Sequence, residues 1–132
     1  MNAEYKQQVD KLRVIYDEFI SLLDSKDSDK RSKVSEFIKQ LETIHTLVGH
    51  IDPFYVFFCE VMYDVDNGEK PNHISVEELL RIISLSIYDL KNALECSIFK
   101  YENTLKFILW LVLNVCIRLN IKLAENKNGT KG

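Results

Sequence analysis

Apolar residues recur every three to four positions along the first half of the chain, a spacing that predicts helices. Over residues 3–24 this spacing forms one stripe along one side of a helix, made of Val9, Leu12, Ile15, Tyr16, Phe19, Leu22 and Leu23. Residues 24–32 contain no apolar side chain, which predicts a solvated loop. A second stripe over residues 33–48 predicts the next helix, with Ser32 as its N-cap and Gly49 just beyond its end.

The third segment opens with Asp52-Pro53, a pair typical of a helix start, because aspartate caps free N–H groups and proline fits the first helical position. Residues 54–63 are apolar on nearly every side, and their β-branched and aromatic side chains would also suit a strand. The helical neighbours favour a helix, which must then lie at the centre of a bundle or be covered by a partner. Asn67-Gly68 predicts the turn that ends it.

A capping box gives the clearest local signal in the sequence. The hydroxyl of Ser75 can accept a free N–H of the first helical turn, and Glu78 can reach back to the amide of Ser75. Ile74 and Leu79 stand at the positions of a hydrophobic staple, which fixes the entry of the chain into the helix. These features predict that the fourth helix begins at Ser75.

No glycine or proline interrupts the helical pattern between Ser75 and Glu125. A single helix of roughly 50 residues would be a rod of about 75 Å, too long for a small domain to cover. We therefore expect a break within residues 95–103, where Ser97 or Asn103 can cap a fifth helix that reaches Glu125.

Five helices without a strand pattern elsewhere predict an all-α, single-domain helical bundle over residues 1–125, followed by a polar, disordered tail at 126–132. The 46% hydrophobic content is enough for a core and too high for disorder of the whole chain. The net charge of −3 disfavours a nucleic-acid partner. Three cysteines, with no signal peptide, predict a soluble protein of a reducing compartment such as the cytoplasm. The longest apolar run, 107–113, is too short for a transmembrane segment, which needs about 20 residues.

The sequence shows no catalytic, cofactor-binding or metal-binding motif. The histidines and cysteines lack the spacings of metal ligands, and there is neither a nucleophile motif nor a glycine-rich phosphate loop. The acidic stretch 64–68 does not fit a calcium loop in any register. We expect no cofactor, and we expect core thiols at all three cysteines, because each lies in an apolar helical stretch: Cys59, Cys96 and Cys116.

Excess apolar helix surface favours a function by protein–protein contact, through homodimerisation or docking on another protein, as in adaptors, inhibitors and immunity proteins. One track of the last helix ends in Arg118, which cannot lie in a core without a partner, so this track is expected at an interface. With the third helix at its border, the predicted interface comprises Phe54, Phe58, Phe107, Trp110, Asn114 and Arg118. The alternative is that the last helix is simply the central one, covered by the other four.

Two other functions stay open at this stage. An all-α, Mg²⁺-dependent nucleotide hydrolase could use dispersed carboxylates, namely Glu60, Asp64, Glu77 and Glu78. A helical protein associated with a membrane surface could use the apolar run 107–113.

Overall fold

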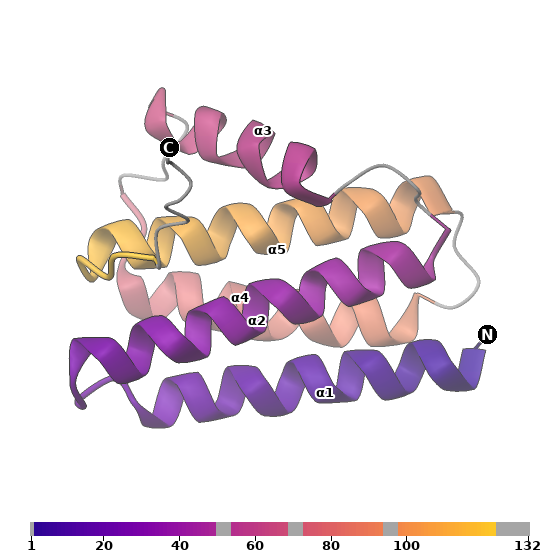
Figure 1. Ribbon diagram of the computed structural model, residues 1–132, viewed down its shortest axis with the longest axis horizontal. Helices are drawn as coiled ribbons and strands as arrows, with labels where there is room; N and C mark the ends of the chain where they lie inside the picture. The colour runs from indigo at the N-terminus through magenta and orange to yellow at the C-terminus, as the bar shows by residue number, and fades with distance from the viewer. Residues whose placement is uncertain (1, 50–53, 69–72, 94–97, 124–132) are drawn as a thin grey trace.

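The computed structural model describes residues 2–49, 54–68, 73–93 and 98–123, with only the backbone at residues 2 and 98–100. Within these ranges the chain forms helices and no strand, which confirms a single small all-α domain (Figure 1). The helices are α1 (Asn2–Ser21), α2 (Asp27–Leu47), α3 (Phe54–Asp66), α4 (Val76–Asn92) and α5 (Ile98–Arg118). The expected Asp52-Pro53 helix start, Cys96, the cap at Ser97 and the 126–132 tail lie outside the described residues.

Four long helices form a ring in the order α1, α2, α5, α4, in which each helix packs against its two neighbours. Each is antiparallel to both neighbours (Figure 1). Hydrogen bonds agree with this arrangement, because the hydroxyl of Tyr5 donates to the carbonyl of Leu90 at 2.6 Å and that of Tyr16 donates to the carbonyl of Leu80. These two bonds join the start of α1 to the end of α4, and the end of α1 to the start of α4.

The third helix, α3, is the return connection of this bundle. Since α2 and α4 run in the same direction, the chain must travel back along the bundle between them (Figure 1). The 13 residues of α3 cover about 20 Å of that path while packing on α5 and, less extensively, on α2. The helix thus lies outside the ring. The expected place at the centre of the bundle is therefore wrong for this helix, and the expected alternative, cover by a partner, stays a prediction.

The core is built mainly around α5, which packs against α2, α3 and α4. Nine of the twelve residues from 105 to 116 are buried. The ring of Tyr5 on α1 packs against the ring of Tyr101 near the start of α5, with the centroids 4.9 Å apart. Burial also raises the pKa of Tyr16, whose ring closes the other end of the α1–α4 contact. The apolar surplus of α5 is therefore explained largely by its central place in the domain.

The second helix begins earlier than the sequence indicated. It starts at Asp27, after a Lys26 N-cap that makes no side-chain cap bond, so Ser32 lies inside the helix and the predicted loop shrinks to the turn after α1. Asp27 and Asp29 stand in the first turn, where negative charge is favoured by the helix dipole. Residues 27–32 lack apolar side chains because these turns face solvent, as the exposure of most of them shows. Gly49 ends α2 as expected, with a φ of +97°.

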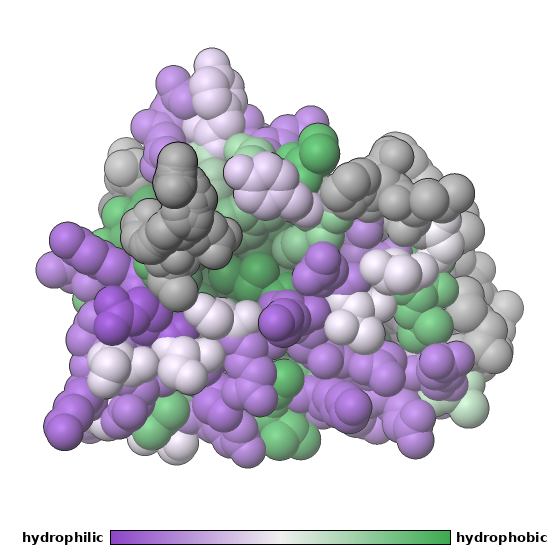
Figure 2. Space-filling model, in the orientation of Figure 1, coloured by the Kyte–Doolittle hydropathy of each residue, from purple (hydrophilic) through white to green (hydrophobic). Residues whose placement is uncertain are grey.

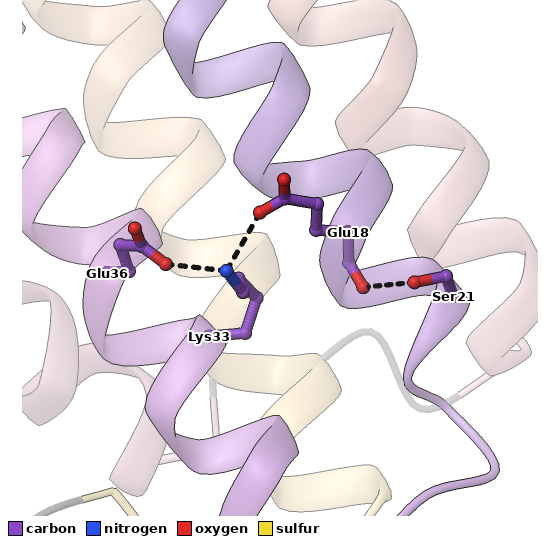
Figure 3. Close-up of polar contacts among 4 residues, drawn as sticks. All are labelled: Glu18, Ser21, Lys33 and Glu36. Atoms are coloured by element: carbon purple, nitrogen blue, oxygen red, sulfur yellow. Dashed lines mark hydrogen bonds and ion pairs between the residues drawn. The ribbon is translucent and has the colours of Figure 1, made fainter.

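An ion-pair cluster just after these extra turns joins α2 to α1 (Figure 3). The ammonium of Lys33 lies 2.8 Å from a carboxylate oxygen of Glu18 on α1 and 2.7 Å from one of Glu36 on α2. These hydrogen bonds raise the pKa of Lys33. Surface pairs of this kind contribute at most about 1 kcal/mol each, so the cluster orients the α1–α2 hairpin without dominating its stability.

One of the two hydrogen bonds of the predicted capping box, the one accepted by Ser75, is present at the start of α4. The hydroxyl of Ser75 accepts the N–H of Glu78 at 3.1 Å. The carboxylate of Glu78 pairs with the guanidinium of Arg81 in the next turn. Leu79 is fully buried and Ile74 packs on the core, as a hydrophobic staple requires.

Ser75→Ala should lower the free energy of unfolding by about 1 kcal/mol, because a first-turn N–H loses its acceptor. Ser32→Ala is the matched control: this exposed serine lies inside α2, so alanine should cost nothing or stabilise slightly. Urea denaturation followed by circular dichroism measures both. Equal losses in the two variants would contradict the helix starts described above.

The predicted break after α4 is confirmed between Asn92 and Ile98, whereas Asn103 lies within α5 and caps nothing. The last helix ends at Arg118 rather than near residue 125. The N–H of Ile121 donates to the carbonyl of Cys116 at 2.8 Å, and the N–H of Asn120 donates to the carbonyl of Ile117 at 3.1 Å. With a φ of +59° at Asn120, this is a Schellman motif closed by asparagine instead of glycine.

Asn120→Ala should destabilise the domain by about 1 kcal/mol, because the left-handed backbone conformation at this position is less favourable for alanine than for asparagine. Asn120→Gly should keep or raise the stability at the same site. Thermal unfolding of the two variants against wild type gives the comparison. A glycine variant less stable than the alanine variant would show that α5 ends differently.

Candidate interaction surface

The outer side of α3 carries an exposed apolar ridge, which we define as Tyr55, Val56, Cys59 and Tyr63. The exposed fractions are 67% for Tyr55, 60% for Val56 and 67% for Tyr63, and Cys59 is also exposed. Helical spacing explains the arrangement, because Phe54, Phe57, Val61 and Val65 are buried on the opposite side and hold α3 against the bundle. The α3 ridge is therefore apolar surface on a firmly packed helix.

A groove separates the α3 ridge from α2. Its volume is about 750 Å³, and apolar side chains from three parts of the chain line it: Ile38, Phe54, Tyr55, Phe58 and Leu123. Figure 2 shows hydrophobic atoms at the floor of the hollow between α3 and α2. Polar side chains of α2 form the rim, among them Glu36, Lys39 and Glu42. An apolar floor with a polar rim is the usual anatomy of a protein-binding groove.

A second, smaller groove of about 260 Å³ lies between α3 and α5. The rings of Phe107 and Trp110 stack at its α5 side, with centroids 6.3 Å apart and an interplanar angle of 15°. The ammonium of Lys106 on α5, which lines this groove, lies 3.3 Å from the carboxylate of Glu60 on α3, so the two charges compensate each other. The α3 ridge is thus flanked by a groove on each side.

The residues predicted for an interface do not form one surface. Phe58 lines the α2–α3 groove, whereas Phe107 and Trp110 line the α3–α5 groove. Phe54 is buried, with its ring centroid 5.7 Å from that of His45. The two remaining predicted residues, Asn114 and Arg118, occupy quite different environments.

Asn114 is only 1% exposed, so it cannot contribute to a surface of this chain. Its Nδ2 donates to the carbonyl of Trp110 at 2.8 Å, one turn back in α5, and its Oδ1 has no partner among the described residues. Arg118 is exposed, and its guanidinium donates to the carbonyl of Ile74 at 2.5 Å. Arg118 thus reaches a partner within the chain, just before α4, instead of requiring one outside it.

Sequence reasoning missed the α3 ridge itself. The run 54–63 is apolar all round, so periodicity cannot say which side faces outward. The core thiol expected at Cys59 is wrong, while that at Cys116 is confirmed. Burial raises the pKa of the Cys116 thiol to about 12, which makes it unreactive at neutral pH.

The carboxylates considered for a hydrolase do not come together in the described residues. Within these ranges, no three histidine, cysteine, aspartate or glutamate side chains gather closely enough to hold a metal ion. Glu60 pairs with Lys106, and Glu78 pairs with Arg81. The arrangement therefore gives no support to Mg²⁺ binding by these four acids.

The apolar run 107–113 belongs mostly to the core. Ile108, Leu109, Leu111, Val112 and Leu113 are buried, so only Phe107 and Trp110 of this run reach the surface. None of the helices in the described ranges combines the length and hydrophobicity that crossing a bilayer requires.

No protein-family model, curated protein or solved structure matches this chain. Inferences about its function therefore rest on its own side chains, and the α3 ridge with its two grooves is the candidate site.

Proposed function

We propose that this chain functions by protein–protein contact and that the α3 ridge is the surface that binds. The observation that carries the proposal is the exposure of Tyr55, Val56 and Tyr63, each at least 60%, on one side of one short helix. Contiguous apolar surface of this kind is typical of interaction sites. Covering a large apolar side chain completely contributes about 1.5–3 kcal/mol, which gives a partner a substantial driving force.

The fixed position of α3 supports the proposal. The helix is anchored by buried residues on its inner side, so the α3 ridge is presented without a further ordering cost. The remaining exposed large apolar side chains of the described ranges are more dispersed over three helices, namely Val14, Leu85, Tyr88, Phe107 and Ile117.

The kind of protein remains an adaptor, inhibitor or immunity protein, with a second copy of the chain among its partners. Such a protein needs no catalytic centre, cofactor or metal ion. A cytoplasmic location suits the proposal, because an exposed thiol such as Cys59 persists in a reducing compartment.

Photo-crosslinking tests the binding surface directly. Tyr63 is replaced by a benzoyl-phenylalanine residue, and Tyr88 on α4, which is 59% exposed, receives the same residue as the matched control. Crosslinked protein adducts should form from position 63 and be much weaker from position 88 when cells expressing the chain are irradiated. Equal yields from both positions, or none from position 63, would refute the α3 ridge as the binding surface.

A further inference from the structure

We propose that residues 121–123 form a latch that controls access to the groove between α2 and α3. In the closed form, which the structure shows, Leu123 lines the groove, and the latch opens when a protein partner enters. This inference rests on the proposed function, because it names how the groove beside the α3 ridge is regulated.

The latch begins where α5 ends. The Schellman motif at Asn120 turns the chain after Arg118. The next residue, Ile121, is only 5% exposed, and its N–H donates to the carbonyl of Cys116 at 2.8 Å. Ile121 is therefore a fixed base, and the two residues after it lead to the groove.

The tip of the latch is Leu123. Of the described residues that line the groove, Leu123 alone belongs to neither α2 nor α3. Its side chain is half-buried and packs on the core, and the lining beside it is apolar, with Ile38 on α2 and Phe58 on α3. Leu123 thus shares an apolar floor that a partner's apolar side chain needs for binding.

One side chain holds this tip in place. Lys122 is exposed, and neither Lys122 nor Leu123 makes a backbone hydrogen bond within the described part of the chain. Segments with few buried contacts and no backbone hydrogen bonds open at the lowest free-energy cost in a native protein. The latch can therefore open at Leu123 while Ile121 and the helices stay in place.

Opening the latch does not require α3 to move. The helix packs mainly on α5, and Phe57, Val61 and Val65 on its inner side are buried. The α3 ridge is therefore presented in both forms, whereas the floor of the groove becomes accessible in the open form. A partner that covers the ridge and enters the groove shifts the population toward the open form, because it binds that form better.

Thiol labelling measures the latch without any partner. In full-length protein with Cys59→Ser and Cys96→Ser, the change Ser35→Cys places a thiol among the residues that line the groove. Leu123→Ser should raise the rate at which a bulky maleimide labels this thiol at least about threefold, because the open form is a minor one, roughly 10% or less, while Leu123 is present. The buried Cys116 thiol does not compete.

Lys122→Ser is the matched control for this measurement. It changes the same segment but keeps the tip of the latch, so the labelling rate should stay that of the parent protein. Circular dichroism and the midpoint of urea denaturation establish that both variants are folded, so that faster labelling cannot arise from unfolding. Equal labelling rates in Leu123→Ser and Lys122→Ser would overturn the latch.

Photo-crosslinking connects the latch to the partner. A benzoyl-phenylalanine residue in place of Phe58 reports on a protein inside the groove. Its adducts should be at least about threefold more abundant with Leu123→Ser than with Lys122→Ser, because the partner no longer has to open the latch. Faster thiol labelling without any adduct from position 58 would overturn the regulatory role. Adducts from position 63 should form in both variants, and their absence would refute the proposed function itself.

Discussion

Leu109→Ala should lower the free energy of unfolding by about 3 kcal/mol. Leu109 is fully buried in α5, and alanine removes apolar contacts and leaves a cavity that the packed helices around α5 cannot easily fill. The matched control is Leu85→Ala, since Leu85 is half exposed on α4 and should cost under about 1 kcal/mol. Chemical denaturation of both variants gives the comparison. Equal losses would mean that α5 is not the centre of the core.

Trp110→Glu should cost about 2 kcal/mol of stability and should leave any self-association through the α3 ridge intact. Trp110 is half-buried, packs on the core and stacks on Phe107, so a carboxylate in its place loses these contacts and is partly desolvated. Tyr88→Glu, at an exposed aromatic position, is the control and should be nearly neutral. Thermal unfolding and sedimentation measure the two properties. If wild type is a dimer and Trp110→Glu is a fully stable monomer, the interface lies on α5 instead of α3.

Periodicity predicted α1 and α4 well, because each has one buried stripe and a polar remainder. Val9, Leu12 and Leu79 are buried where their spacing placed them. The start of α2 could not be found this way, because residues 27–32 form helical turns beyond the core, and no apolar side chain marks them. There the informative signal was the pair of first-turn acids, Asp27 and Asp29.

The location of α3 follows from topology, which local sequence does not encode. Only the parallel direction of α2 and α4 makes α3 a crossing helix with one side uncovered (Figure 1). Cys59 is therefore exposed, although it lies in a mainly apolar stretch, as the buried Cys116 does.

Asn114 and Arg118 show a related difficulty. Their polarity suggested a surface track on the last helix, yet the amide of Asn114 bonds the backbone of its own helix and the guanidinium of Arg118 reaches the carbonyl of Ile74. Polar groups can thus be satisfied by backbone partners that become neighbours only when the chain folds.

Sedimentation equilibrium of wild type, Tyr63→Glu and Tyr88→Glu tests most directly the proposal that the α3 ridge binds protein, with a second copy of the chain as the partner. Wild type and Tyr88→Glu should shift with rising concentration from the 15.5 kDa of one chain toward twice that mass. Tyr63→Glu should remain folded and stay at the mass of one chain, because a carboxylate on the ridge would be buried without a partner. A single-chain mass for all three proteins up to about 1 mM would contradict self-association through the α3 ridge.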